Sequence, residues 1–353
     1  MRIRLVIIDS NEKYADRLIA NLEMHYPEKF EIYQFSRPET FQEFIAANRA
    51  DVLLMSEDVD LELPALPVNL AYAFFADSPS VDTIKNVKTV CRFQKLNLIY
   101  KEILSLYSER HTNITSYKNQ SNSHTRLQLF VPVSGGVGAT TAACAMAIYC
   151  AAKGQKVLYF SLEQCADTSF WLDGATGATF SDVVYTIAIN RSNIKLRLES
   201  MTSTSSQNVQ YYASPAIGLD SLELSPEDIT RLLEELLSLG VYDTIVVDMD
   251  NQLNQRLAAA IKMADSVVLV ADGSPASNAK FQKYYECLKI VSEKNKLSVE
   301  HKWKILYNRF SSKTGTRLEW QDIPVAGGIP TIQSLDAKAI LAEMARQPVF
   351  ELI

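Results

Sequence analysis

Residues 127–141 read LQLFVPVSGGVGATT, and this stretch decides the fold of the second half of the chain. An apolar strand, LQLFVPV, leads into Gly135, Gly136 and Gly138, and a helix of small residues follows at 142–152. Glycines at this spacing let successive backbone N–H groups converge on a phosphate, and the N-terminus of the next helix adds the positive end of its dipole. The stretch therefore predicts a nucleotide-binding loop.

The predicted loop lacks its usual cation. In the ordinary pattern, G-x-x-x-x-G-K-[ST], a lysine precedes the first hydroxyl residue, and here that position is Ala139. The backbone amides from Gly135 to Thr141 can still hold a triphosphate. Phosphoryl transfer, however, needs neutralisation of charge that grows in the transition state. We therefore expect hydrolysis to suffer more than binding.

Composition excludes several classes of protein. The chain has 353 residues, of which 47% are hydrophobic and 22% charged, so it is globular and long enough for two domains. Its net charge of -6 argues against broad nucleic-acid binding, and no nucleic acid is expected as a partner. Five irregularly spaced cysteines favour reduced thiols over a disulfide or metal framework. Without a signal peptide or an apolar run of roughly 18 residues, we expect no transmembrane segment and a cytoplasmic location.

A polar stretch, HTNITSYKNQSNSHT (111–125), reads as a linker between residues 1–110 and 126–353. Strands alternate with helices on both sides of it, so we predict an α/β protein with two doubly wound parallel-sheet domains, flavodoxin-like and then P-loop. The expected strands are 2–10, 31–35, 51–56, 71–77, 88–93, 127–133, 156–163, 243–250, 265–273 and 303–310. The expected helices are 12–26, 40–49, 97–110, 140–153, 225–239, 275–293 and 334–346.

The first half resembles a response-regulator receiver domain in the order of its elements. Receivers use an acidic pair after the first strand, a phosphoacceptor aspartate after the third and a lysine after the fifth. Here Asp9 is followed by Ser10, Ser56 occupies the acceptor position, and Lys95 is a candidate for the lysine in a register left open. The resemblance implies a degenerate receiver used for protein contacts, and Ser56 contradicts control by phosphorylation.

Residues 127–353 resemble MinD/ParA-type ATPases of the deviant-loop class. That family begins with K-G-G-x-G-K-T-T, so both of its lysines are absent here, at Ser134 and Ala139. Its next strand ends V-L-x-x-D-x-D, which KVLYFSLE matches with Ser161 and Glu163 in the acidic places. The Walker B strand, YDTIVVD, is preserved and ends in Asp248.

The resemblance implies ATP and Mg2+ as cofactors and assigns roles to named residues. Thr140 and Asp248 would hold magnesium, and Glu163 is the candidate catalytic residue. The segments Tyr307-Asn308-Arg309 and Gly328-Ile329-Pro330 match family landmarks, and the asparagine of the first reads adenine in relatives. Ordinary alternatives stay open, since a glycine turn, a loop amide or a strand-end glutamate is common. Nucleotide contacts are expected from Gly135, Gly136, Val137, Gly138, Ala139, Thr140, Thr141, Asn308, Arg309 and Pro330.

The combination of a degenerate receiver with an eroded MinD/ParA-like domain resembles the TadZ/CpaE group of pilus-assembly proteins. The resemblance implies an ATP-binding localisation or scaffold protein for Flp/Tad type IV pilus assembly, with weak or no ATPase activity. The expected partners are a second copy, bound through residues 126–353, and pilus or secretion machinery proteins, bound through residues 1–110. Recruitment to the inner face of the membrane or to a pole is expected. The alternative is an active ATPase that cycles in partition or division-site positioning.

Overall fold

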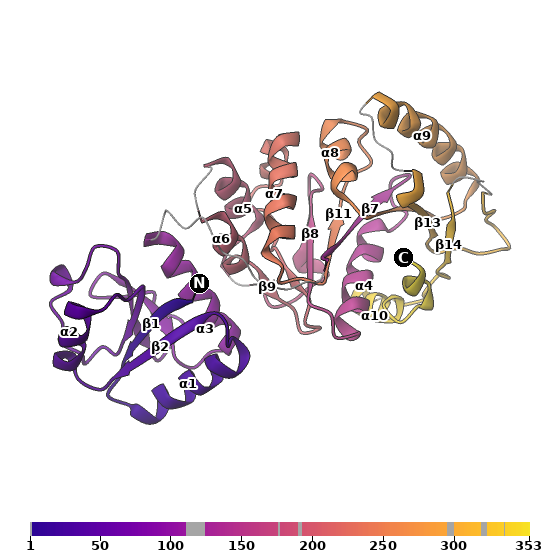
Figure 1. The fold of residues 1–353 in the computed structure, drawn as a ribbon. Coiled ribbons are helices and arrows are strands. Elements are labelled where there is room, and N and C mark those ends of the chain that lie inside the picture. Colours follow the sequence, from indigo (N-terminus) through magenta and orange to yellow (C-terminus); the bar gives the residue numbers. More distant parts are fainter. Residues whose placement is uncertain are drawn as a thin grey trace. The chain divides into compact units, whose positions relative to one another are not determined.

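The computed structural model describes residues 2–110, 124–175, 177–189, 193–294, 300–318, 323–334 and 336–353. The chain divides into two compact units (Figure 1), of which one contains residues 2–110 and 193–200 and the other contains the remaining described residues. Both units consist of helices packed on a mostly parallel sheet, which confirms the predicted fold class. Most of the predicted linker, residues 111–123, lies outside the described residues.

The sheet of the first unit has the strand order β2-β1-β3-β4-β6-β5. Its first five members run parallel and only β5 is antiparallel, so the order 2-1-3-4-5 of flavodoxin-like folds is reproduced. The strands are β1 (Ile3–Ile8), β2 (Phe30–Phe35), β3 (Val52–Met55), β4 (Ala71–Ala76), β5 (Thr83–Ile84) and β6 (Val87–Cys91).

Helices cover both faces of this sheet. Apolar side chains of α1 (Glu12–His25) and α3 (Leu96–Arg110) form one core with it, and α2 (Pro38–Ala47) packs Phe41 against the other face. Asn11 caps α1 by accepting from the backbone of Tyr14, and Pro38 opens α2, which are ordinary start signals of helices.

An additional helix of the first unit, α6 (Ile194–Ser200), comes from the second half of the sequence and was not predicted. Its Leu196 joins the core formed by α1 and α3. Its buried Glu199 accepts from Lys29 Nζ at 3.3 Å and from Tyr100 Oη at 2.7 Å. Residues 193–200 are therefore part of the receiver-like unit, although they lie within the predicted range 126–353 of the second domain.

The sheet of the second unit has the order β14-β13-β12-β7-β11-β8-β10-β9, and only β9 is antiparallel to its neighbour. The near-continuous apolar runs at the centre are buried along their length, as expected of strands covered on both faces. The strands are β7 (Arg126–Pro132), β8 (Val157–Ser161), β9 (Ser203–Thr204), β10 (Gln210–Tyr211), β11 (Thr244–Asp248), β12 (Ser266–Ala271), β13 (Trp303–Tyr307) and β14 (Val325–Gly328).

Helices again form layers on this sheet (Figure 1). The alanine-rich α4 (Ala139–Ala152) shares one core with α10 (Ala337–Met344) and with residues 349–353 near the C-terminus. The amphipathic α7 (Pro226–Leu239) packs on α8 (Gln255–Met263) and on α5 (Phe180–Ala188), and α9 (Pro275–Lys294) packs on β12. The structure adds α5, α8, β9, β10 and β14 to the predicted elements.

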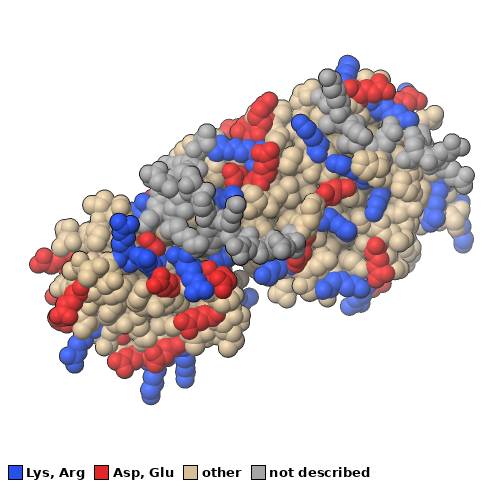
Figure 2. All heavy atoms as spheres, viewed as in Figure 1, with Lys and Arg blue, Asp and Glu red and all other residues tan. Residues whose placement is uncertain are grey.

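On the face shown in Figure 2, Lys and Arg side chains are interspersed with Asp and Glu. No helix among the described residues is long and apolar enough to span a bilayer. The central strands β7, β8, β11 and β12 run parallel, so their carboxyl ends meet at one edge of the sheet. In open α/β sheets this edge is where ligands bind.

Candidate functional site: a phosphate loop and an acidic cluster

The glycine-rich loop connects β7 to α4 in a conformation that few other residues would tolerate. Gly136 and Gly138 have φ values of 76° and 82°, and Gly138 is the N-cap of α4 without a side-chain cap. Across the described part of the chain, the backbone N–H groups of residues 134–141 form no hydrogen bond of normal geometry, although residues 135–136 make a tight turn. The loop and the first turn of α4 therefore present a run of free donors, as an anion-binding helix N-terminus does.

Asn308 and Arg309, which directly follow β13, hold this loop through hydrogen bonds to its carbonyl groups. Asn308 is 2% exposed, and its Nδ2 donates to the carbonyl O of Val137 at 2.8 Å. Arg309, with a φ of 54°, donates through its guanidinium to the carbonyl O of Gly136. These bonds engage loop carbonyls and leave the N–H groups free. The structure thus brings Asn308 and Arg309 to the loop, and their contact with a nucleotide stays a prediction.

Pro330 is exposed and lies two residues after the end of β14. The hydroxyl of its neighbour Thr331 donates to the carbonyl O of Arg309 at 3.3 Å. The predicted residues of this C-terminal landmark are thus assembled beside residues 308–310, and the role of Pro330 in nucleotide binding stays a prediction.

The two loop positions at which the MinD/ParA pattern has lysine carry buried side chains in this structure. Ala139 is 4% exposed and belongs to the core formed by α4 and the sheet. Ser134 is also buried, and its hydroxyl donates to Ser277 Oγ of α9 at 3.3 Å. The side chains of residues 134–141 include no cation.

Three residues predicted for metal and catalysis converge beside the first turn of α4. Thr140 Oγ1 donates to Glu163 Oε2 at 3.3 Å. Asp248 is fully buried at the end of β11, where its Oδ2 accepts from Ser161 Oγ at 3.4 Å and from Tyr159 Oη at 3.5 Å. Its Oδ1 is buried without a hydrogen-bond partner among the described residues. A buried acceptor in this state is costly, and a cation can satisfy it.

The carboxyl groups of this cluster disfavour one another's ionisation. Burial, and then the charge of Glu163, raises the pKa of Asp248 well above its usual value. Burial and the charge of Asp250 likewise raise the pKa of Glu163. Asp250 was missed by the sequence analysis, although its two-residue spacing from Asp248 at a strand end was a usable signal.

The cluster fits a magnesium ion that arrives with a nucleotide. In the described part of the chain, no group of three or more His, Cys, Asp or Glu side chains is arranged to hold a metal by itself. Magnesium commonly uses one or two carboxylates together with substrate phosphates and water. Thr140 and Asp248 would supply the protein oxygens, and a bound ion would offset the mutual repulsion of the acids.

The receiver-like unit holds a built-in cation where a receiver binds metal. Asp9 is fully buried, and Arg92, directly after β6, lies with its guanidinium 3.2 Å from Asp9 Oδ2 in an ion pair without hydrogen-bond geometry. The same guanidinium is 3.7 Å from Asp77 and packs over the rings of Tyr14 and Phe75 at 5.4 and 5.2 Å. Arg92, rather than Lys95, is therefore the basic partner of Asp9. Its signal was its place after the fifth parallel strand.

The serines that replace the receiver acids lie beside another carboxylate. Hydroxyl groups of Ser56 and Ser10 hold the pKa of Asp58 below its usual value. Ser56 itself is 1% exposed, directly after β3. A serine cannot form the acyl phosphate of a receiver, so the chemistry of phosphorelay is missing from this position.

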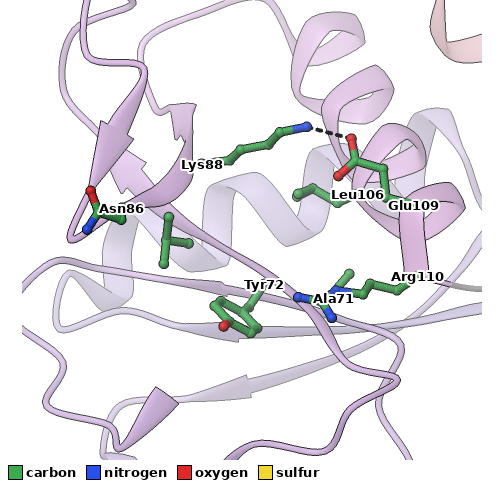
Figure 3. A pocket seen from close by; sticks show the side chains of 8 residues that line it. Ala71, Tyr72, Asn86, Lys88, Leu106, Glu109 and Arg110 are labelled. Atoms are coloured by element: carbon green, nitrogen blue, oxygen red, sulfur yellow. Dashed lines mark hydrogen bonds and ion pairs between the residues drawn. The ribbon is translucent and has the colours of Figure 1, made fainter. Parts of the chain in front are cut away.

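A separate pocket of about 180 Å³ opens at the opposite end of the receiver-like sheet (Figure 3). It lies at the N-terminal ends of β4 and β6 and at the last turn of α3, and its lysine, Lys88, is paired with Glu109 at 2.5 Å. The pocket is therefore distinct from the edge that carries Asp9 and Ser56. Its lining residues are Ala71, Tyr72, Asn86, Val87, Lys88, Leu106, Glu109 and Arg110.

Comparisons with known proteins agree with this two-part organisation. Residues 1–108 match the family model of the TadZ-like receiver domain, and residues 129–301 match that of an AAA domain. No curated protein matches the chain.

Solved structures similar to the chain include a ParA family ATPase from Chlorobium tepidum, with 21% identity, 66% of this chain and 93% of that chain covered, and a TM-score of 0.49. Another is the septum site-determining protein MinD with Mg-ADP from Pyrococcus horikoshii, with 20% identity, coverages of 65% and 86%, and a TM-score of 0.47. A third is the MinC–MinD cell division complex of Aquifex aeolicus, with 17% identity, coverages of 63% and 94%, and a TM-score of 0.47.

Proposed function

We propose that this chain is an ATP-binding scaffold for pilus assembly. It belongs to the proteins that join a TadZ-like receiver domain to an AAA domain. The AAA domain binds Mg-ATP and forms a homodimer, and the receiver-like domain contacts proteins of the Flp/Tad pilus or secretion machinery. The protein directs that machinery to its place at the inner face of the membrane or at a pole.

One observation carries the nucleotide-binding part of the proposal. The N–H groups of residues 134–141 form no hydrogen bond of normal geometry among the described residues, while Asn308 and Arg309 hold the carbonyls of the same loop. Oriented N–H groups at a helix N-terminus bind phosphate without a side-chain cation. Thr140 and the unpaired oxygen of Asp248 complete the oxygens that a magnesium ion bound to nucleotide would use.

The same site supports slow hydrolysis. Relatives supply a lysine from within the loop, and here Ser134 and Ala139 are buried in contacts with the protein. A cation delivered to the transition state accelerates phosphoryl transfer by about 10³–10⁵ in GTPases. Glu163 is half-buried, and its carboxylate accepts a hydrogen bond from Thr140 Oγ1. Loss of the lysines thus favours a nucleotide-bound state that persists.

The receiver-like domain fits a role in protein contacts because the groups that a receiver uses for phosphorylation are replaced or already paired. Arg92 neutralises Asp9, and Ser56 replaces the acceptor. The domain therefore lacks the phosphoacceptor through which a receiver changes its charge, which suits a constant docking module.

Turnover and assembly of the full chain test this function together. We expect saturable Mg-ATP binding, a mass near that of a dimer by light scattering with ATP, and turnover far below the enzyme median of about 10 per second. The active-ATPase alternative predicts turnover near that median and a dimer that disappears as ATP is consumed. In cells, a fluorescent fusion should mark the sites of pilus assembly, and a diffuse fusion with normal pili would contradict the scaffold role.

A further inference from the structure

A cavity of about 380 Å³ lies between the phosphate loop and α9. The loop contributes Val133, Ser134 and Gly135 to its lining, and Asn251 comes from the segment after β11. The cavity is thus at the carboxyl edge of the sheet, directly beside the free N–H groups of the loop. The α9 residues that line it are Lys280, Lys283, Tyr284 and Cys287.

These residues form one face of α9. Ser277, which bonds to Ser134, begins a series in which Lys280, Tyr284 and Cys287 follow at spacings of three, four and three. Side chains at such spacings lie on the same side of a helix. The face of α9 that is tied to the loop at Ser134 therefore also carries lysines toward the cavity.

The cavity has an excess of positive charge. Lys280 and Lys283 are exposed, and neither forms an ion pair with any described residue. The lining includes no Asp or Glu. By contrast, the lysine of the receiver-like pocket is neutralised by Glu109.

Tyr284 contributes to the wall of the cavity, but its hydroxyl does not face it. Tyr284 is only 8% exposed, and its hydroxyl is buried out of reach of a water-sized molecule. The charged groups that the cavity offers to an anion are therefore the two lysines.

We propose that this cavity is an anion site, in which Lys280 and Lys283 bind the terminal phosphates of a nucleotide held by the same chain's loop. The inference rests on the proposed function and deepens it, because it locates the cations absent at positions 134 and 139. The lysines reach the phosphates from the side, through α9, instead of from within the loop. Phosphate binding then draws α9 and the loop together.

Affinity measurements with matched lysine variants test the proposal in the full chain. The variants Lys280→Gln and Lys283→Gln should each weaken Mg-ATP binding by about tenfold, as for loss of one charged hydrogen bond, and the double variant should lose more. AMP, which lacks the terminal phosphates, should bind the wild type and the variants alike. Lys294→Gln, at the far end of α9, is the control for a loss of charge and should bind ATP normally.

Alkylation of Cys287 locates the ligand, since this exposed thiol lines the same cavity. Saturating Mg-ATP, or inorganic tripolyphosphate, should slow its alkylation several-fold in the wild type and leave the rate unchanged in the lysine double variant. If the double variant binds Mg-ATP as the wild type does, or if ATP leaves the Cys287 rate unchanged, the α9 site is wrong while the proposed function stands. If the wild type binds no ATP, both fall together.

Discussion

Gly138 offers the sharpest test of the loop geometry, through the substitution Gly138→Ala. Its φ of 82° costs a residue with a Cβ about 1–2 kcal/mol. A Cβ there would also lie 2.4 Å from Asn308 Nδ2, so the amide has to leave the carbonyl O of Val137. A lost hydrogen bond with a buried partner adds about 1–2 kcal/mol. The free energy of unfolding should fall by about 2–4 kcal/mol, which is a decrease in Tm of about 4–16 °C for a unit of this size.

Tryptophan fluorescence can follow this loss in the second unit alone. The protein has three tryptophans, at positions 171, 303 and 320, and residues 1–110 contain none. Thermal unfolding of the full chain by this signal therefore reports on the nucleotide-binding unit. The same experiment with Mg-ATP present should show a smaller stabilisation by nucleotide for the variant than for the wild type, because the loop is displaced.

The matched control is Gly135→Ala, three residues earlier in the same loop. Gly135 does not have a positive φ, and a Cβ there would meet no atom within 4 Å. Without nucleotide, the free energy of unfolding of this variant should differ from that of the wild type by no more than about 0.5 kcal/mol, and its Tm should shift accordingly little. Equal losses of stability in the two variants, or no loss in Gly138→Ala, would refute the fastening of the loop by Asn308.

Three other predictions concern the receiver-like unit and the missing cation. Acetyl phosphate should add no phosphoryl mass to the full chain, because Ser56 replaces the acceptor; a stoichiometric adduct by intact-mass measurement that Ser56→Ala removes would contradict the degenerate receiver. Burial raises the pKa of Glu102 to about 7, although the hydrogen bond from Gln94 acts in the opposite direction. The stability that the protonated carboxyl group contributes is therefore fully present below about pH 4.5 and is lost as the pH rises through 7. The difference in Tm between Glu102→Gln and the wild type by circular dichroism should therefore be near zero at pH 4.5 and positive at pH 8; a difference that does not change with pH would contradict it. Ala139→Lys should tighten Mg-ATP binding by calorimetry but lower the Tm without nucleotide, because the side chain starts from a buried position; unchanged affinity would mean that the loop does not hold phosphate.

Local patterns explain why much of the fold could be predicted. The apolar strands β7, β11 and β12 and the cap of α7 at Ser225 carry their signals within a few residues. The glycine loop was found for the same reason, since its spacing follows from the backbone conformation that the turn requires. Asp248 was singled out through the resemblance of its strand to the family's Walker B strand, and its role as a magnesium ligand stays a prediction.

Contacts between distant segments explain most of what was missed. The buried pair of Lys29 and Glu199 joins residues 170 positions apart, and nothing local marks α6 as part of the receiver-like unit. Asn308 reaches the loop from 171 residues away, so its bond to Val137 could not be inferred from a motif that concerns nucleotide. The lysines of α9 read as ordinary surface charges until the cavity beside Ser134 is seen.

Calorimetric titration of ATP into the full chain, with and without magnesium and beside Asp248→Asn, tests the central claim most directly. The claim is that the loop after β7 still binds a magnesium triphosphate without either lysine. We expect one ATP per chain, with an affinity at least tenfold higher with magnesium for the wild type and little magnesium dependence for Asp248→Asn. No saturable binding at millimolar Mg-ATP, or binding that is equal in the two proteins and indifferent to magnesium, would contradict it.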